Sequence, residues 1–356
     1  MGAQACGAVV GRKRARATAA ALARAPRALV ENEPGLCASV GRAHAALLRA
    51  GGQAWLWRAP DCDCAEAPPG GGLDIVAHSA RAGASAAKLA ELRVDGDSAE
   101  REIGDPPHRW ITNVSCESLW LRAAGRRWLL PARSACVVSA MREWQDALAR
   151  IRPADGFELV VLDPPWPSHS AQRARAYETV DVRRVLASHV RLGPLLSDVG
   201  SVVIVWCTNN KALSDWVVHA LFPEWGLRHV ATWFWLKLTA GAGELVTGSV
   251  DSPHRKPWEP MLLGVRGAPD WADRLPARRV ICACPVGHSV KPPLEAIVRQ
   301  HVRERSFAPD GTKLELFARE LRTGWCSAGD QAVALQAEGW YCARARSSPP
   351  PPGVGG

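Results

Sequence analysis

An apolar segment that runs directly into two consecutive prolines is the feature that most constrains this chain. Residues 159–162 read Leu-Val-Val-Leu, and Asp163-Pro164-Pro165-Trp166 follows at once. The apolar run predicts a buried strand of an α/β sheet. Two prolines in series end such a strand and lack backbone donors, so we expect their carbonyls to stay free as acceptors. Ligands bind outside the carboxyl ends of these strands, and the sequence therefore predicts a ligand site here.

The side chains of this tetrad suit methylation of an exocyclic amine on a base. An amino group conjugated to a purine is a poor nucleophile, because its lone pair is delocalised into the ring. If Asp163 accepts one N–H and a proline carbonyl accepts the other, the nitrogen can direct its lone pair at a methyl donor. Trp166 offers a flat face on which a base can stack. Attack on a sulfonium methyl then depends mainly on positioning and electrostatics. The alternative is a strand-end turn with a structural tryptophan.

The composition favours a polyanionic partner and argues against a membrane-spanning one. The chain has 356 residues and a formal net charge of +9, which favours association with nucleic acid. No apolar run approaches the ~18 residues that suggest a transmembrane helix, so we expect no membrane partner. A chain of this length can hold an α/β domain of ~200 residues and a smaller N-terminal part.

The cysteines are scattered, and two pairs are spaced by one residue. These pairs are Cys62 with Cys64 and Cys282 with Cys284, and His288 follows the second pair. On an extended strand, both sulfurs of a pair would lie on one face, which makes zinc binding conceivable. Structural zinc sites normally use wider ligand spacings, so we favour reduced thiols and expect no metal.

Strand patterns alternate with helix patterns, which predicts an α/β fold with a mostly parallel, layered sheet. Apolar, β-branched or aromatic stretches predict strands at 127–130, 134–139, 159–162, 201–207, 229–238, 261–265, 280–284 and 313–318. Helical patterns occur at 84–92, 141–150, 211–222 and 292–304. No glycine-rich loop of the dinucleotide-binding or P-loop type follows an early strand.

The ends of the chain have a biased composition. Residues 1–30 contain no acidic residue and are rich in Arg and Ala. Within them, the basic stretch 11–16 could be a nuclear localisation patch. The whole arm is also typical of a mitochondrial presequence or of a disordered basic segment. We expect a nuclear location, with cytosol and mitochondrion left open. The Pro- and Gly-rich stretch 342–356 predicts a disordered tail.

From residue 160 onward the sequence resembles the MT-A70 family of S-adenosylmethionine-dependent adenine N6-methyltransferases, and within it the methyltransferase-like protein 4 branch. The motifs that carry the resemblance occur in the family's order within residues 135–341. They are Asp163-Pro-Pro-Trp166, Asp251-Ser-Pro-His-Arg-Lys-Pro-Trp-Glu259, His288-Ser-Val-Lys-Pro-Pro293, Leu314-Glu-Leu-Phe-Ala-Arg319 and Gly324-Trp325.

The resemblance implies a Rossmann-like methyltransferase domain with a permuted motif order, in which the tetrad precedes much of the cofactor site. Together with the composition, it divides the chain into a basic arm (1–30), an N-terminal region that could contribute to substrate binding (31–134), the methyltransferase domain (135–341) and the tail (342–356). It also implies a nucleic-acid substrate, with RNA favoured over DNA, and a monomeric protein.

The resemblance further implies roles for residues at the matching positions. Asp163, Pro164, Pro165 and Trp166 would form the catalytic tetrad and hold the target adenine. The cofactor S-adenosylmethionine would contact Asp163, Lys291, Arg319, Asp330 and Gln331. Among these, Lys291 would meet the cofactor's carboxylate and Arg319 would lie at or near its ribose. The substrate would contact Trp166, Asp251, His254 and Lys256.

Departures from the family's pattern keep two functional hypotheses open. Ala140 stands where the branch has an Asp that helps to hold the adenine end of the cofactor, and Glu320 and Asp330 stand where the family has Asn. An acidic side chain lacks the amide donor and adds negative charge. The first hypothesis is methyl transfer to adenine N6 in nucleic acid, either RNA (such as 2′-O-methyladenosine of small nuclear RNA) or DNA. The second is a catalytically impaired pseudoenzyme that binds nucleic acid or acts as an adaptor subunit.

Overall fold

The structure is a computed structural model of the chain. It describes residues 90–94, 100–102, 109–123, 126–139, 141–166, 182–239, 244–247, 249, 256–267, 269, 271–285, 290–302 and 312–338. The expectations for the basic arm and for the Pro- and Gly-rich tail fall outside these residues.

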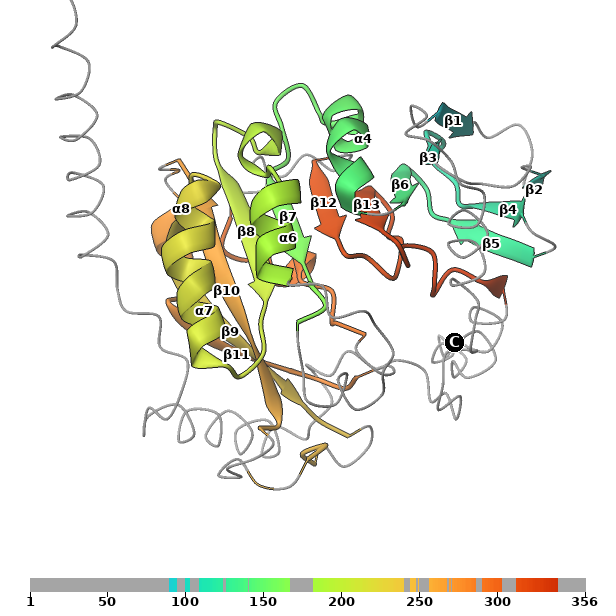
Figure 1. The fold of residues 1–356 in the computed structure, drawn as a ribbon. Coiled ribbons are helices and arrows are strands. Elements are labelled where there is room, and N and C mark those ends of the chain that lie inside the picture. The colour runs from blue at the N-terminus through green and yellow to red at the C-terminus, as the bar shows by residue number, and fades with distance from the viewer. Residues whose placement is uncertain are drawn as a thin grey trace, which may run out of the picture.

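A ten-stranded sheet forms the centre of the described structure (Figure 1). Its strands, in spatial order, are β1 (Ala90–Val94), β3 (Arg109–Asn113), β6 (Ser134–Val138), β13 (Trp325–Gly329), β12 (Lys313–Leu316), β7 (Leu159–Leu162), β8 (Ser201–Trp206), β10 (Trp258–Arg266), β9 (Arg228–Lys237) and β11 (Arg278–Ala283). Six neighbouring pairs are parallel and three are antiparallel. The predicted mostly parallel α/β sheet is confirmed.

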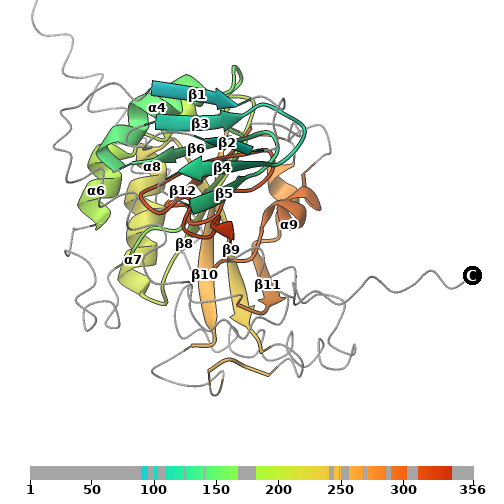
Figure 2. The same ribbon diagram turned by 90° about the vertical axis from the view of Figure 1, so that its right-hand side faces the viewer.

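Helices cover both faces of this sheet (Figure 2). One face carries α4 (Trp144–Ile151), α6 (Val182–His189), α7 (Lys211–Trp216) and α8 (Phe222–Glu224), and the other carries α9 (Glu295–Arg299). A π-helical stretch, Val217–Leu221, joins α7 to α8. A smaller three-stranded sheet, made of β2 (Glu100–Glu102), β4 (Leu119–Ala123) and β5 (Arg126–Leu130), lies near β3 and β6.

Strand β8 explains why the sequence shows long apolar runs. Successive side chains of a strand point to opposite faces, and here both faces are covered. Val203 and Val205 enter the apolar cluster beneath α4, α6 and α7, whereas Val202 and Ile204 enter the cluster beneath α9. All residues of β8 are therefore buried, and no polar alternation is left in its sequence.

The order of the strands creates a switch point between β7 and β12. On one side, β7 pairs with β8, the next of these strands along the chain. On its other side, β7 pairs with β12, which comes from the C-terminal part and is followed by β13. Connections leave in opposite directions from this point, and ligands of open α/β sheets bind in the crevice outside it. The strand with the tetrad precedes β12 and β13 in the chain, as the permuted motif order predicts.

All eight predicted strands are confirmed, most of them with ends shifted by a few residues. The prediction of a helix at 84–92 is wrong for the described residues 90–92, which form part of β1. Their Ala and Leu content favours a helix, but pairing with β3 overrides this preference. The helix predicted at 292–304 is present in shorter form as α9. Strands β1, β2, β3, β4 and β13 were not predicted.

The ten-stranded sheet extends across the expected boundary between residues 134 and 135. Strands β1 and β3 lie before this boundary, and β3 pairs with β6 on its other side. The division of the chain into those two parts stays a prediction. None of the helices in the described ranges is long and apolar enough to cross a membrane.

Gly156 lies just before β7, where the backbone is packed closely against the segment at Leu196. Its φ is +85°, and a Cβ added there would lie 2.5 Å from the Leu196 carbonyl oxygen. Gly226 has a similar φ of +73°, but a Cβ there would meet only Arg266, at 3.7 Å. We expect Gly226→Ala to lower the free energy of unfolding by roughly 1–2 kcal/mol, the cost of left-handed backbone. Gly156→Ala should lose about 1–3 kcal/mol more through the overlap. Urea unfolding measures both values, and equal losses would show that the segment at Leu196 moves aside.

Candidate active site

The tetrad lies at the switch point, directly after β7. The backbone N–H of Asp163 donates to the Leu316 carbonyl of β12, at 3.4 Å. The N–H of Trp166 donates to the Pro164 carbonyl, at 2.8 Å, which closes a tight three-residue turn. The expectation that both proline carbonyls stay free is therefore wrong for Pro164. A carbonyl oxygen has two lone pairs, so Pro164 can still accept a second hydrogen bond.

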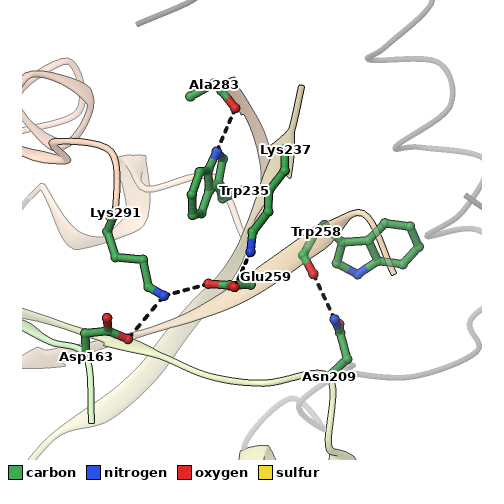
Figure 3. Close-up of polar contacts among 8 residues, drawn as sticks. All are labelled: Asp163, Asn209, Trp235, Lys237, Trp258, Glu259, Ala283 and Lys291. Atoms are coloured by element: carbon green, nitrogen blue, oxygen red, sulfur yellow. Dashed lines mark hydrogen bonds and ion pairs between the residues drawn. The ribbon is translucent and has the colours of Figure 1, made fainter. Parts of the chain in front are cut away.

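Charged side chains form a row beside the tetrad (Figure 3). The Lys291 Nζ lies 3.3 Å from the Asp163 Oδ1 and 2.8 Å from the Glu259 Oε2. The Lys237 Nζ contacts the other Glu259 oxygen, Oε1. Lys237 ends β9, Glu259 belongs to β10, and Lys291 precedes α9. Positive and negative groups alternate along this row, so each carboxylate has an ammonium partner, as buried charges require.

The two carboxyl groups of the row differ in how firmly they stay ionised. Burial raises the pKa of Asp163, and Lys291 opposes this only in part. Burial also disfavours the charged form of Glu259, but Lys291 and Lys237 outweigh it, so the pKa of Glu259 lies below its usual value. For Lys291, burial lowers the pKa, but the two carboxylates more than compensate and raise it. The pKa of Asp163 thus lies above the usual value of an aspartate, whereas the pKa of Glu259 lies below the usual value of a glutamate.

Indole rings support the ammonium groups of the row. Lys291 Nζ lies 5.4 Å from the ring centroid of Trp206, and Lys237 Nζ lies 4.9 Å from that of Trp235. The two indoles contact each other edge to face, with centroids 5.8 Å apart. The indole N–H of Trp235 donates to the Ala283 carbonyl, at 3.0 Å, which fixes the ring in place (Figure 3). These cation–π contacts restrict where the ammonium groups can lie.

The side chain of Trp166 is anchored in the core. It is 8% exposed, and its indole N–H donates to the Trp206 carbonyl at the end of β8, at 2.6 Å. Asn209, also after β8, donates to the Trp258 carbonyl of β10, at 2.8 Å (Figure 3). The ends of β7, β8 and β10 are thereby tied together. Stacking of a base on Trp166 stays a prediction.

A second charged cluster follows β12. Arg322 pairs with Glu315 of β12, at 2.6 Å, and with Glu320, at 3.4 Å. Glu315 is buried, which raises its pKa, and Arg322 acts against this rise. The motif resemblance places Glu320 where the family would have Asn. The Arg322 guanidinium lies beside Glu320 and offsets part of the negative charge that this residue adds, because it is shared with Glu315.

The residues predicted to bind the cofactor gather at one edge of the sheet. Asp163 follows β7, Arg319 follows β12 and Asp330 follows β13, and Lys291 reaches Asp163 from the loop before α9. Burial raises the pKa of Asp330, whereas its own N–H, that of Gln331 and the charge of Arg319 lower it. The positive charge of Arg319 also acts on Asp163.

The predicted substrate residues are only partly described. Lys256 precedes β10, and its Nζ lies 5.3 Å from the ring centroid of Trp258. Asp251 and His254 lie outside the described residues, as do Ala140 and His288. Within the described ranges, no cluster of His, Cys, Asp or Glu could hold a metal ion.

Reasoning from the sequence missed residues that the structure places in the site. They are Lys237, Glu259, Asn209, Glu315 and Arg322. A usable signal existed for Lys237, because a lysine directly after an aromatic strand lies at a strand end. Glu259 closes one of the quoted motifs, but nothing in the sequence pairs it with Lys291. Glu315 alternates with leucines on β12, which places it on the opposite face from them.

Comparisons with known proteins show which family the chain resembles. Residues 157–331 match the MT-A70 family model. The chain is 35% identical over 247 residues to N6-methyladenosine RNA methyltransferase MTA1 of Pyricularia oryzae, covering 65% of this chain and 62% of the relative. It is 30% identical over 266 residues to N(6)-adenine-specific methyltransferase METTL4 of Mus musculus, covering 72% and 54%. It is 31% identical over 188 residues to a DNA N6-methyl methyltransferase of Caenorhabditis elegans, covering 51% and 47%.

The chain thus spans less than two thirds of the length of each of these relatives. The matched segment starts just before β7 and ends just after β13, so it contains the tetrad, the charged row and the residues that follow β12. The resemblance read from the sequence motifs is confirmed, and the chain belongs to the MT-A70 family.

Proposed function

We propose that this chain is an S-adenosylmethionine-dependent methyltransferase that acts on N6 of adenine in nucleic acid. The observation that carries the proposal is the pair of acceptors at the end of β7. The Asp163 carboxylate and the Pro164 carbonyl belong to consecutive residues at the switch point, and Pro164 begins the tight turn that ends at Trp166. Together they can accept a hydrogen bond from each of the two N–H groups of an exocyclic amine. This turns the nitrogen lone pair away from the ring.

The residues of the site also fit the cofactor. An ammonium group has three donors, and two of those on Lys291 go to Asp163 and Glu259. The third can donate to the carboxylate of the cofactor's methionine part. Arg319, Asp330 and Gln331, at the ends of β12 and β13, would hold its nucleoside part, in the crevice where α/β sheets bind nucleotides. When bound, S-adenosylmethionine supplies a methyl group on a positively charged sulfur.

The chemical role of the protein is then to hold and orient the amine. N6 gains a bond to the methyl carbon, the bond from that carbon to sulfur breaks and leaves its electron pair on sulfur, and N6 gives one proton to the Asp163 carboxylate or to water. Asp163 accepts a hydrogen bond from the N6 amino group and stabilises the positive charge that grows on N6 during transfer. Its own ionisation depends on Lys291, since burial alone would protonate it more readily. Lys291 is therefore placed to serve both the cofactor and the catalytic carboxylate.

The charge pairing of Glu320 bears on the pseudoenzyme alternative. That alternative rests on acidic residues at positions where the family has Asn. Arg322 lies beside Glu320, which lowers the electrostatic cost of one of these replacements. A carboxylate can also accept hydrogen bonds from ribose hydroxyls. The contact supports cofactor binding and thus an active enzyme.

For the substrate, we propose RNA rather than DNA. The Pyricularia relative is named an RNA methyltransferase, whereas the Caenorhabditis relative is named a DNA methyltransferase. The net charge of +9 suits either polyanion. Methylation of RNA and DNA oligonucleotides of one sequence, side by side, separates the two. We further propose a nuclear location, on the basic stretch 11–16, and a monomer, on the resemblance to the methyltransferase-like protein 4 branch.

Replacement of Asp163 tests the proposed reaction. Asp163→Ala removes the amine acceptor, and we expect single-turnover methylation of an adenosine oligonucleotide to fall by roughly 100-fold or more. As a check that the assay contains a cofactor-binding protein, calorimetry with S-adenosylmethionine should detect binding to the wild type. Asp198→Ala is a matched control, because Asp198 is an exposed carboxylate paired with Arg266 far from the tetrad in the chain. A variant at Asp163 that keeps a tenth of the wild-type rate would show that the tetrad is not the catalytic centre.

The acid limb of the rate profile should depend on Lys291. Transfer needs ionised Asp163, so the rate falls as pH falls through the pKa of this group. Lys291 lowers that pKa, and Lys291→Gln should raise it and move the fall in rate to higher pH. Lys237→Gln is the control, because Lys237 contacts Glu259 and not Asp163. Single-turnover rates at saturating cofactor, measured over the acid range, decide this. An unmoved limb in Lys291→Gln would contradict the role given to Asp163.

Trp166→Phe separates anchoring from stacking. Phe keeps an aromatic face but cannot donate to the buried Trp206 carbonyl, so we expect a loss of about 1–3 kcal/mol in the free energy of unfolding. Trp225→Phe removes a similar buried bond, to the Val190 carbonyl, away from the tetrad. Both variants should lose stability in urea unfolding, but only Trp166→Phe should also slow methyl transfer. If Trp166→Phe were as stable as the wild type, the anchoring role would be wrong.

A further inference from the structure

Gln336 lies buried between the loop after β12 and the small sheet. Its side chain is 0% exposed. The Oε1 accepts the N–H of Leu321, at 3.2 Å, and the Nε2 donates to the Leu129 carbonyl of β5, at 2.8 Å. The backbone carbonyl of Gln336 also accepts the N–H of Leu129, at 2.9 Å. One amide group thus connects the loop after β12 to β5.

The segment around Gln336 holds this loop on both sides of Glu320. The N–H of Leu335 donates to the Arg319 carbonyl, at 3.0 Å, and Leu321 donates to the Gln336 side chain. The backbone before and after Glu320 is therefore fixed from outside the loop. The side chain of Glu320 is directed to Arg322. The position of residues 319–320 therefore depends on these two hydrogen bonds as well as on β12.

Apolar packing alone would not set this position. Ala318, Leu321 and Val333 form a cluster with Trp128 and Leu130 of β5. Burial of such side chains is favourable but non-directional, so it holds the segments together without fixing their register. The two bonds of the Gln336 amide are directional, and leaving either buried partner unsatisfied is costly. The amide therefore selects one register of the loop against β5.

We infer that Gln336 is a positioning residue of the cofactor site, which fixes Arg319 and Glu320 to the three-stranded sheet. The inference rests on the proposed function, because that proposal assigns Arg319 to the cofactor. Gln336 touches neither the tetrad nor the charged row through any of these bonds. Its loss should thus weaken cofactor binding and leave the methyl-transfer step itself largely intact.

The test replaces Gln336 by Met, which keeps the length of the side chain and removes both amide bonds. We expect the dissociation constant for S-adenosylmethionine, measured by calorimetry, to rise roughly tenfold, as for one lost hydrogen bond. The KM for the cofactor should rise by a similar factor, while kcat at saturating cofactor stays within about twofold, because only binding interactions are lost.

Asn113→Leu is a matched control. Asn113 is 1% exposed, and its Nδ2 donates to the carbonyls of Leu130, at 3.3 Å, and Pro131, at 3.0 Å. This variant also removes a buried amide beside β5, but it leaves the bonds of Gln336 to Leu321 and Leu129 in place. Both variants should unfold at lower urea concentration than the wild type, and only Gln336→Met should change cofactor affinity.

Hydrogen exchange of the wild type adds a measurement that needs no variant. The amides of Leu129 and Leu321 both donate to Gln336, so both should be protected in the protein without cofactor. Rapid exchange at Leu321 beside slow exchange at Leu129 would overturn the inference. The inference would also be overturned if the wild type binds S-adenosylmethionine and Gln336→Met binds it with the same affinity. In that case the proposed function would still stand. A wild type that binds no S-adenosylmethionine would overturn both.

Discussion

The ammonium of Lys291 lies between two buried carboxylates, and the geometry of the site depends on this contact. Asp163 follows β7 and Glu259 lies on β10, with β8 between them in the sheet. Lys291 spans β8 above the ring of Trp206 and thereby ties the loop before α9 to three strands. Removal of this charge would leave two carboxylates close together in a poorly solvated place. A buried ion pair of this kind fixes the position of its side chains more than it stabilises the fold.

The sheet carries a polar strip between two apolar regions on one face. Towards β9 and β10, the face is covered by the cluster that includes α9, and towards β6 it is covered by the cluster shared with the small sheet. Between them, β12 and β13 present Glu315 and Ser327, which are register partners, with Arg322 above. This strip leads to the carboxyl ends of β12 and β13. An open α/β sheet thus keeps its polar residues where a polar ligand can use them, without breaking either core.

The sequence was informative where a signal was local. The strand before Asp163 and its end at two prolines could be predicted because both depend on adjacent residues. Pairings between distant segments could not be predicted in this way. Residues 90–92 have helical composition and form a strand because β3 lies beside them. The bond from Trp166 to Trp206 and the ion pair of Glu259 with Lys291 join separate segments. The role of Gln336 likewise depends on partners that are far away in the sequence.

The insertion of β12 and β13 between β6 and β7 has a consequence for how the chain reaches its fold. Strands β6 and β7 are separated by fewer than thirty residues, and β12 begins only at Lys313. During synthesis, the edges of β6 and β7 that later pair with β13 and β12 therefore lack these partners until residues 313–329 are made. Such edges are templates for wrong pairing, and contacts between distant segments form slowly. The segment that completes the binding edge is also the one that closes the sheet, so a nascent chain gains its site and its last core strands in the same step.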